Sequence, residues 1–159
     1  MNMEQEEPLE ETDETLMWWD FVGLGDFMFD ARKKGYELDY LDWDTLDVLG
    51  RYVVETKVSH INKDELEMSR FVACYIYLGY VLNFKYKTKW ILVDDGTVDS
   101  GMFAVANLPN HKDPRLYFVP RGAIVSVILG RVPEGLKEYM RTTFEDEYIS
   151  AIADMPTED

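Results

Sequence analysis

The sequence predicts a single α+β domain, in which N-terminal helices pack on a small antiparallel β-meander and a C-terminal helix closes the core. Two observations support this fold class. Up to about residue 84, apolar residues recur at the three- and four-residue spacing of helix faces. Beyond it, short runs rich in β-branched and aromatic residues alternate with clusters of turn-forming residues, as in strands joined by short loops. The chain of 159 residues is long enough to bury one sizeable core.

Composition sets the boundaries of the predicted domain. Residues 1–12 are acidic and nearly free of apolar side chains, so we expect a disordered acidic tail. The domain is expected over residues 13–152, and residues 153–159 are expected to form a C-terminal tail. The sequence contains no internal repeat and no linker.

The first predicted helix runs from Asp13 to Lys34 and has a strongly apolar face. Three basic residues end it, where the helix dipole favours cations, and Gly35 fits the position just beyond the last helical residue. Gly23 and Gly25 lie inside this helix, and glycine disfavours a continuous helix at those points.

The stretch YELDYLDWDTLDVL, residues 36–49, places five carboxylates among aromatic and leucine side chains. Apolar and acidic residues alternate over residues 36–40, which predicts a short, half-buried strand. Asp42 fits the N-cap of the next helix, which we expect to continue to about Ser59. Asp42 and Asp44 are therefore favoured by the helix N-terminus itself.

A second N-terminal signature, INKDEL at residues 61–66, predicts Asn62 as the cap of a helix that ends near Phe84. This helix is apolar on most sides, so we expect it to be central and buried. Gly79 lies in its interior, where glycine costs about 1 kcal/mol relative to alanine. A close neighbour at Gly79 would explain the glycine.

Three strands are expected over residues 89–95, 101–108 and 115–120, and the short loops between them predict an antiparallel meander. Residues 121–130 fit either a short apolar helix or a strand, and Pro133 is expected to open a final helix. The residues expected to be mostly buried are Trp19, Phe27, Leu46, Leu49, Phe71, Val72, Tyr75, Leu78, Trp90 and Leu92.

The charge of the chain is strongly negative and uneven. The formal net charge is −15, and residues 1–50 contain 15 acidic and 3 basic side chains, a net charge of −12. Such a field favours a basic protein as partner and disfavours nucleic acids and anionic membranes. Lysines alternate with aromatic residues over residues 84–90, which is typical of a protected strand edge or helix end. The alternative explanation of the acidity is that it only keeps the protein in solution.

The motifs of common enzymes fail when they are compared with the sequence, and we expect no enzyme. GLGDFM lacks the third glycine of a dinucleotide loop, and GRVPEGLK lacks the lysine and hydroxyl residue of a P-loop. His60 and His111 have no histidine or cysteine at ligand spacing, so no metal and no cofactor are expected. Cys74 is flanked by apolar residues and is expected to be a buried thiol rather than a nucleophile.

Three features favour a cytoplasmic location. The N-terminal residues lack the basic and apolar regions of a secretory signal. The longest apolar run, Ala123 to Gly130, is too short to cross a membrane. A lone cysteine cannot form an intramolecular disulfide and fits a reducing compartment.

Three acidic residues of the stretch 36–49 have no evident structural role once the helix cap is assigned. These are Glu37, Asp39 and Asp47. We expect them to form the partner-binding surface, with the ring of Trp43 as an apolar anchor. Unpaired carboxylates would steer a basic partner and raise its rate of association. The alternative is a solvated face that binds nothing.

Four sets of short segments form a recognisable pattern: Leu41–Leu46 with Leu49 and Arg51, Tyr77–Val81, Lys89–Trp90, and Gly135, Leu136 and Tyr139. In these segments the chain resembles a group of small uncharacterised bacterial α+β proteins. This group is of the general kind that includes the immunity partners of secreted toxins. The resemblance implies a protein that neutralises a cationic toxin. An adaptor or structural module of unknown partner, and a small-molecule-binding domain, are the alternatives.

Overall fold

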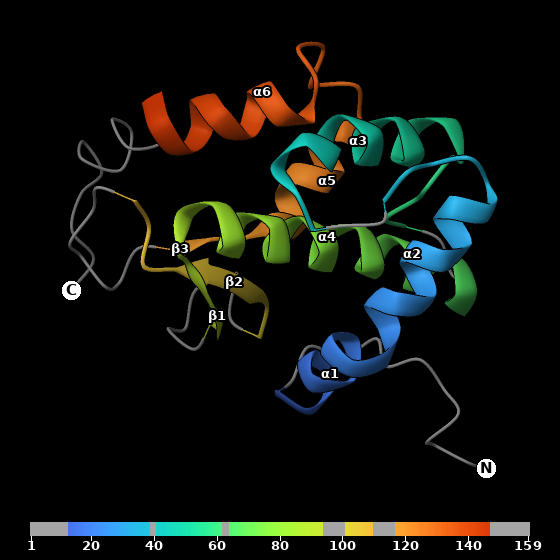
Figure 1. The fold of residues 1–159 in the computed structure, drawn as a ribbon, viewed down its shortest axis with the longest axis horizontal. Coiled ribbons are helices and arrows are strands. Elements are labelled where there is room, and N and C mark those ends of the chain that lie inside the picture. Colours follow the sequence, from blue (N-terminus) through green and yellow to red (C-terminus); the bar gives the residue numbers. More distant parts are fainter. Residues whose placement is uncertain (1–12, 39–40, 62–63, 94–100, 110–116, 147–159) are drawn as a thin grey trace.

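The computed structural model describes residues 13–38, 41–61, 64–93, 101–109 and 117–146. Within these ranges the chain is α+β, as the sequence predicts, and helices outweigh a small antiparallel sheet (Figure 1). The predicted tails, residues 1–12 and 153–159, lie outside the described residues.

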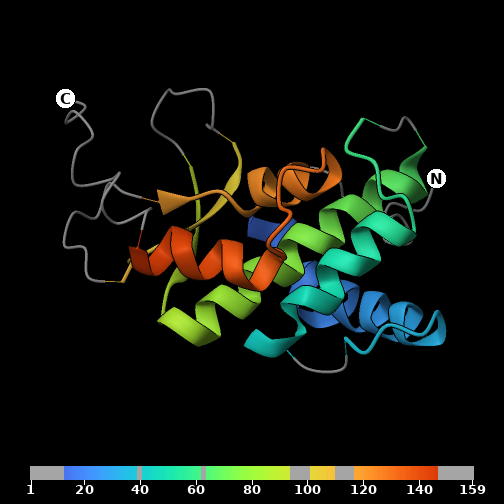
Figure 2. The ribbon, with the colours of Figure 1, turned by 90° about the horizontal axis from the view of Figure 1, so that it is seen from above.

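The N-terminal elements are α1 (Asp13–Trp18), the π-helical turn η2 (Trp19–Gly23), α2 (Leu24–Lys33), the 3-10 turn η3 (Trp43–Thr45), α3 (Leu46–Glu55) and α4 (Glu65–Tyr86). The C-terminal elements are β1 (Lys89–Leu92), β2 (Phe103–Ala106), β3 (Tyr117–Phe118), α5 (Pro120–Ile128), α6 (Leu136–Arg141) and the π-helical turn η4 (Thr142–Asp146). The sheet lies beside the C-terminal half of α4, and α2 lies beside its N-terminal half (Figures 1 and 2).

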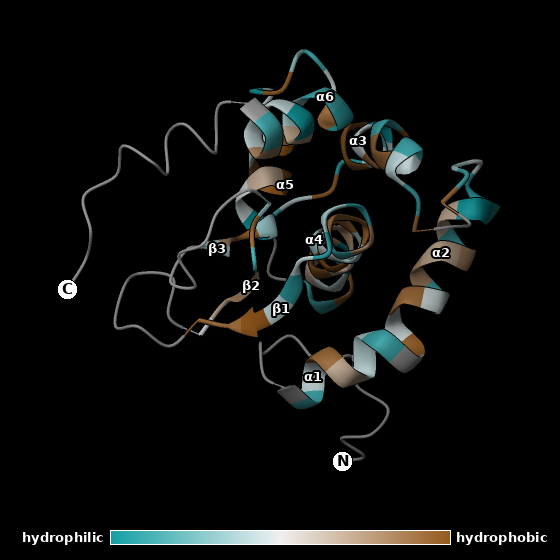
Figure 3. Ribbon diagram, turned by 60° about the vertical axis from the view of Figure 1, so that its left-hand side comes forward, coloured by the Kyte–Doolittle hydropathy of each residue, from teal (hydrophilic) through white to brown (hydrophobic). Residues whose placement is uncertain are grey.

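Helix α4 is the centre of the molecule. Its apolar residues point in most directions, and 12 of its 22 residues are buried. Viewed close to its axis, α4 lies at the centre, with α2, α3, α5 and the sheet around it (Figure 3). The predicted cap Asn62 lies outside the described residues. The N-cap is Asp64, whose carboxylate accepts the N–H groups of Leu66 and Glu67 at 2.9 and 3.4 Å.

The packing of Trp90 on α4 explains the glycine in the helix interior. A Cβ atom at Gly79 would overlap the indole ring of Trp90 in β1. The same ring makes edge-on contacts with Tyr80 and Phe103, at centroid distances of 5.5 and 5.9 Å. The close neighbour expected at Gly79 is confirmed, because only a residue without a side chain lets the sheet approach the helix this closely.

The N-terminal helix contains a π-helical turn that ends at Gly23, whereas Gly25 lies within the regular helix α2. The π-helical turn η2 separates α1 from α2, and a Cβ atom at Gly23 would overlap the rings of Trp18 and Trp19. At the other end of α2, Gly35 has φ 91° and is the residue just past the C-cap, as predicted. The N–H of Tyr36 donates to the carbonyl of Ala31 at 3.0 Å, which completes a Schellman motif.

The prediction of a strand over residues 36–40 is wrong for residues 36–38, which are the part that the structure describes. Residues 36–38 form an irregular segment that lies against α3, so no neighbouring strand is available to pair with it. The Tyr36 ring packs edge-on against Tyr52 at 5.3 Å, and its hydroxyl donates to Glu55 at 2.7 Å. Leu38 is buried, so alternating burial arises here without a sheet.

The helix after this segment begins and ends differently from the expectation. Asp42 occupies the N-cap position with extended backbone, but its carboxylate makes no capping hydrogen bond. Instead the Thr45 hydroxyl donates to the Asp42 carbonyl at 2.6 Å, and the 3-10 turn η3 precedes α3. The helix ends at Glu55 rather than Ser59, because Lys57 adopts a left-handed conformation with φ 57°.

The C-terminal half follows the predicted order. Strands β1, β2 and β3 form an antiparallel meander, with Trp90 opposite Val105 and Val105 opposite Phe118. Residues 120–128 form the helix α5, with Pro120 at its first turn. The last helix, α6, starts at Leu136, three residues after Pro133.

The core matches the expected residue list except at β1. Of the ten residues expected to be buried, eight are buried, and Trp90 and Leu92 are half-buried. Both exceptions belong to β1, which lies at the edge of the sheet and pairs with β2 alone among the described strands. Helix α4 packs on β1 and β2, and α2 and α3 pack on α4, so α4 joins the N-terminal helices to the meander.

Candidate functional site

The structure separates the residues predicted to bind a partner. Glu37 is exposed and follows Tyr36, which contacts the C-terminal end of α3 through Glu55. Asp47 lies in the first turn of α3, whose ten residues span about 15 Å. Asp39 lies outside the described residues. Glu37 and Asp47 therefore mark opposite ends of α3 rather than one cluster.

Asp47 has a structural role that the sequence did not reveal. Its Oδ1 accepts the backbone N–H of Lys137 at 3.1 Å and would lie 2.8 Å from a Cβ atom at Gly135. The neighbouring Asp44 binds the Lys137 ammonium at 2.7 Å, and this hydrogen bond holds the pKa of the Asp44 carboxyl below its usual range. The expectation that Asp47 is unpaired is wrong, because this carboxylate caps the N-terminus of α6.

The capping role of Asp47 predicts that substitution of Asp47 destabilises the protein more than substitution of Asp44. Asp47→Ala should lower the free energy of unfolding by about 1 kcal/mol, the usual cost of losing a helix cap. Asp44→Ala removes an exposed ion pair and should cost clearly less than Asp47→Ala. Urea unfolding followed by circular dichroism measures both values. Equal effects of the two changes would contradict the capping role.

Trp43 is half-buried, and much of its ring is already in contact with the protein. The ring lies edge-on to Tyr86 at 5.6 Å, and the Lys85 ammonium lies 5.4 Å from its centroid. Tyr86 in turn stacks on Phe144 at 5.0 Å. Trp43 therefore belongs to an aromatic cluster at the C-terminal end of α4, and only part of its surface is open to a partner.

One concave surface among the described residues, the α3 groove, lies between α3 and the segment that joins α5 to α6. It has a volume of about 450 Å³ and is lined mainly by apolar side chains such as Val54, Val127 and Val132. Its charged residues are paired within the fold. Glu55 accepts the Tyr36 hydroxyl and pairs with Arg51 at 3.5 Å, and the Tyr36 hydrogen bond lowers the pKa of Glu55.

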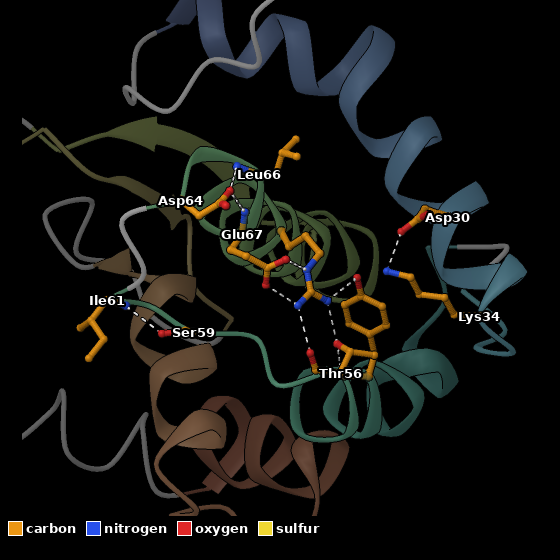
Figure 4. A network of polar contacts seen from close by, with 10 residues as sticks. Asp30, Lys34, Thr56, Ser59, Ile61, Asp64, Leu66 and Glu67 are labelled. Carbon is orange, nitrogen blue, oxygen red and sulfur yellow. Dashed lines mark hydrogen bonds and ion pairs between the residues drawn. The ribbon is translucent and has the colours of Figure 1, made fainter.

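A second concave surface, the α2–α4 groove, lies between η2 and α2 on one side and the first turns of α4 on the other. It has a volume of about 410 Å³. Buried side chains of Trp19, Phe27 and Tyr52 line its interior. Figure 4 shows Asp30 on the α2 side and Leu66 on the α4 side. The sequence could not predict this groove, because the crossing of two helices creates it.

Arg70 holds the interior end of this groove together. Its guanidinium donates to both oxygens of Glu67, at 3.3 and 2.6 Å, and to the Tyr52 hydroxyl at 3.3 Å. It also donates to the hydroxyl and the carbonyl of Thr56, at 2.8 and 3.0 Å. These five contacts match the five N–H donors of arginine, so Arg70 has no donor left for an anion. Because Thr56 is the C-cap of α3, Arg70 also satisfies a free helix carbonyl.

The chemistry of cysteine, histidine and metals finds little support in the described part of the chain. No group of three or more His, Cys, Asp and Glu side chains is placed there to hold a metal ion. The His60 ring packs 6.2 Å from Phe71, and His111 lies outside the described residues. Within the same ranges, no helix combines the length and the apolar character needed to span a bilayer.

The thiol of Cys74 is a buried core group, which a labelling experiment can check. Cys74 is fully buried in α4, and burial raises the pKa of its thiol. A maleimide should therefore label the denatured protein rapidly and the native protein only at the rate of unfolding. Mass spectrometry measures the labelled fraction. Rapid labelling of the native protein would instead indicate an accessible, reactive thiol.

Comparison with known proteins leaves the function to be inferred from the chain itself. No protein-family model, curated protein or solved structure matches it. The features that bear on function are thus the two grooves, the exposed side chains that border them and the charge of the molecule.

Proposed function

We propose that this domain binds a basic partner protein and neutralises it, and that the partner is a bacterial toxin, so that the chain acts as an immunity protein. The observation that carries the proposal is the net charge of −12 over residues 1–50, out of −15 for the chain. In the described part of that region, carboxylates lie on the helices that border the α2–α4 groove, beside exposed apolar side chains.

The proposed activity needs binding and no chemistry. A protein neutralises a toxin when it covers the surface that the toxin uses on its target. A strongly acidic surface attracts a basic partner over a distance set by the ionic strength, about 8 Å at physiological salt. This attraction raises the association rate more than it changes the rate of dissociation.

Capture of the partner tests the proposal. The immobilised protein is exposed to proteins of the source cell, and the captured protein is identified, produced separately and tested for toxicity in growing cells. We expect a basic partner whose toxicity disappears when this protein is co-expressed. A captured partner that does not impair growth would exclude the immunity role. An acidic partner, or binding that does not respond to salt, would exclude the binding of a cationic protein.

The predicted acidic residues can be tested with the same partner. Glu37→Gln with Asp39→Asn should give slower association that depends less on salt, because both changes weaken the attractive field. Asp47 is left unchanged since it caps α6. Stopped-flow fluorescence over a salt series measures the rates. The matched control is Glu134→Gln with Glu138→Gln, which removes the same charge from another part of the surface; identical curves for both pairs would exclude a special role of Glu37 and Asp39.

A further inference from the structure

We propose that the α2–α4 groove is the docking site of the basic partner, and that it receives a basic amphipathic helix. A lysine or arginine side chain of this helix reaches Asp26 and Asp30, and its apolar face covers Leu66. The inference rests on the proposed function and adds to it the site and the kind of segment that the site accepts.

The shape of the groove suits a side chain from outside. Its volume of about 410 Å³ falls within the usual size of protein binding pockets, roughly 300–1,000 Å³. Helices η2 and α2 form one wall and the first turns of α4 form the other, so the groove is bounded by rigid elements. A groove between two helices is a common site for an amphipathic helix.

Exposed apolar side chains lie in the groove and next to it. Leu66 on α4 lines the groove and is 71% exposed, while Val22 and Phe29 are 44% and 66% exposed and lie outside its lining. Val22, Asp26 and Phe29 follow one another at spacings of four and three residues, so they share one side of the η2–α2 helix. Apolar side chains that remain exposed around a concave surface are typical of interaction sites.

The free charge of the groove is negative. Arg70 uses its five donors within the fold, and Glu67 is neutralised by it. Asp26 has no hydrogen-bond or ion-pair partner among the described residues. Asp30 pairs with Lys34 at 3.0 Å in an exposed helix pair, a type of contact that contributes little to stability. A cation from a partner can therefore replace Lys34 at small cost.

The negative charge of the chain also determines which kind of partner can bind in the α2–α4 groove. A second copy of this chain carries the same net charge of −15 and would be repelled. The surface of an anionic membrane is excluded for the same reason. A helix with one apolar side and flanking lysines or arginines complements both the exposed Leu66 and the carboxylates on α2.

A synthetic peptide provides the probe. A fluorescein-labelled basic helix, with leucines at every third and fourth position and lysines elsewhere, is titrated with the full chain, and anisotropy gives the affinity. Backbone amide NMR spectra of the full chain locate the site. We expect the largest shifts in η2, α2 and the first turns of α4, and no binding of the same peptide with glutamates in place of lysines.

Matched variants decide between the two grooves. Leu66→Ser and Asp26→Asn should each weaken binding of the basic peptide by about tenfold, equivalent to about 1.4 kcal/mol. Both residues are exposed, so the fold should be retained, and circular dichroism verifies it. The controls are Val54→Ser, an exposed apolar residue of the α3 groove, and Glu134→Gln, an exposed carboxylate elsewhere.

The outcomes separate this inference from the proposed function. Shifts in the α3 groove, or equal loss of affinity in the control variants, would overturn the inference and leave the binding of a basic partner intact. Absence of peptide binding, or equal binding of the glutamate peptide, would also overturn it. The proposed function is judged independently by the captured partner and its toxicity.

Discussion

Gly79→Ala is expected to lower the free energy of unfolding by about 2 kcal/mol, although alanine is the better helix former. The added methyl group would overlap the Trp90 ring, which lies directly on the glycine. Either the indole or the whole of β1 must move, and Trp90 also contacts Tyr80 and Phe103. Overpacking of this kind outweighs the gain in helix propensity of about 1 kcal/mol.

A matched glycine provides the control. Gly25 also lies within a helix, but nothing approaches the position of its Cβ atom, so Gly25→Ala should stabilise the protein by about 0.5–1 kcal/mol. Trp90→Leu should remove most of the additional cost of Gly79→Ala, because a smaller side chain leaves space for the methyl group. Urea denaturation of Gly79→Ala, Gly25→Ala, Trp90→Leu and the double variant Gly79→Ala with Trp90→Leu gives these values. Similar effects of the two alanine substitutions would show that the contact with Trp90 does not determine the cost of a methyl group at residue 79.

Arg70→Met is expected to cost about 3 kcal/mol of unfolding free energy. The change leaves the Glu67 carboxylate and the Thr56 carbonyl without their donor, and hydrogen bonds to charged groups each contribute about 1.5–3 kcal/mol. Arg70→Lys should recover little of this, since an ammonium cannot reproduce the planar set of five donors. Chemical denaturation measures both variants.

The pair of Arg141 with Glu138 is the natural control. It has the same three-residue spacing and also forms two hydrogen bonds, at 2.9 and 2.7 Å. Its side chains are 40% and 49% exposed, whereas those of Arg70 and Glu67 are 18% and 36% exposed. Arg141→Met should therefore cost less than about 1 kcal/mol. If both arginines proved equally costly, the contacts of Arg70 with α3 would contribute nothing beyond the local pair.

The sequence predicted those parts of the fold that depend on local periodicity. The central helix, the three strands of the meander and the C-terminal position of Gly35 follow from spacing and from the chemistry of turn residues. Gly79 was informative for the same reason, because a glycine inside a strongly helical pattern requires a neighbour to explain it. These inferences need no knowledge of what lies far along the chain.

The remaining features depend on contacts between distant residues. Asp47 caps a helix that begins 89 positions later, so its role could not be read from its neighbours. The alternation over residues 36–40 was interpreted as a strand, but an irregular segment on a helix surface produces the same pattern when Leu38 is buried. The α2–α4 groove arises from the crossing of two helices, and Arg70 resembles an ordinary surface arginine in the sequence.

The central position of α4 links binding to the stability of the whole protein. Because α2, α3, α5 and the sheet all pack on this helix, it cannot unfold while the rest of the fold persists. A partner that binds the first turns of α4 therefore stabilises more than one local segment. It shifts the folding equilibrium of the entire domain by mass action, so resistance to heat and to proteolysis should rise together with occupancy of the groove.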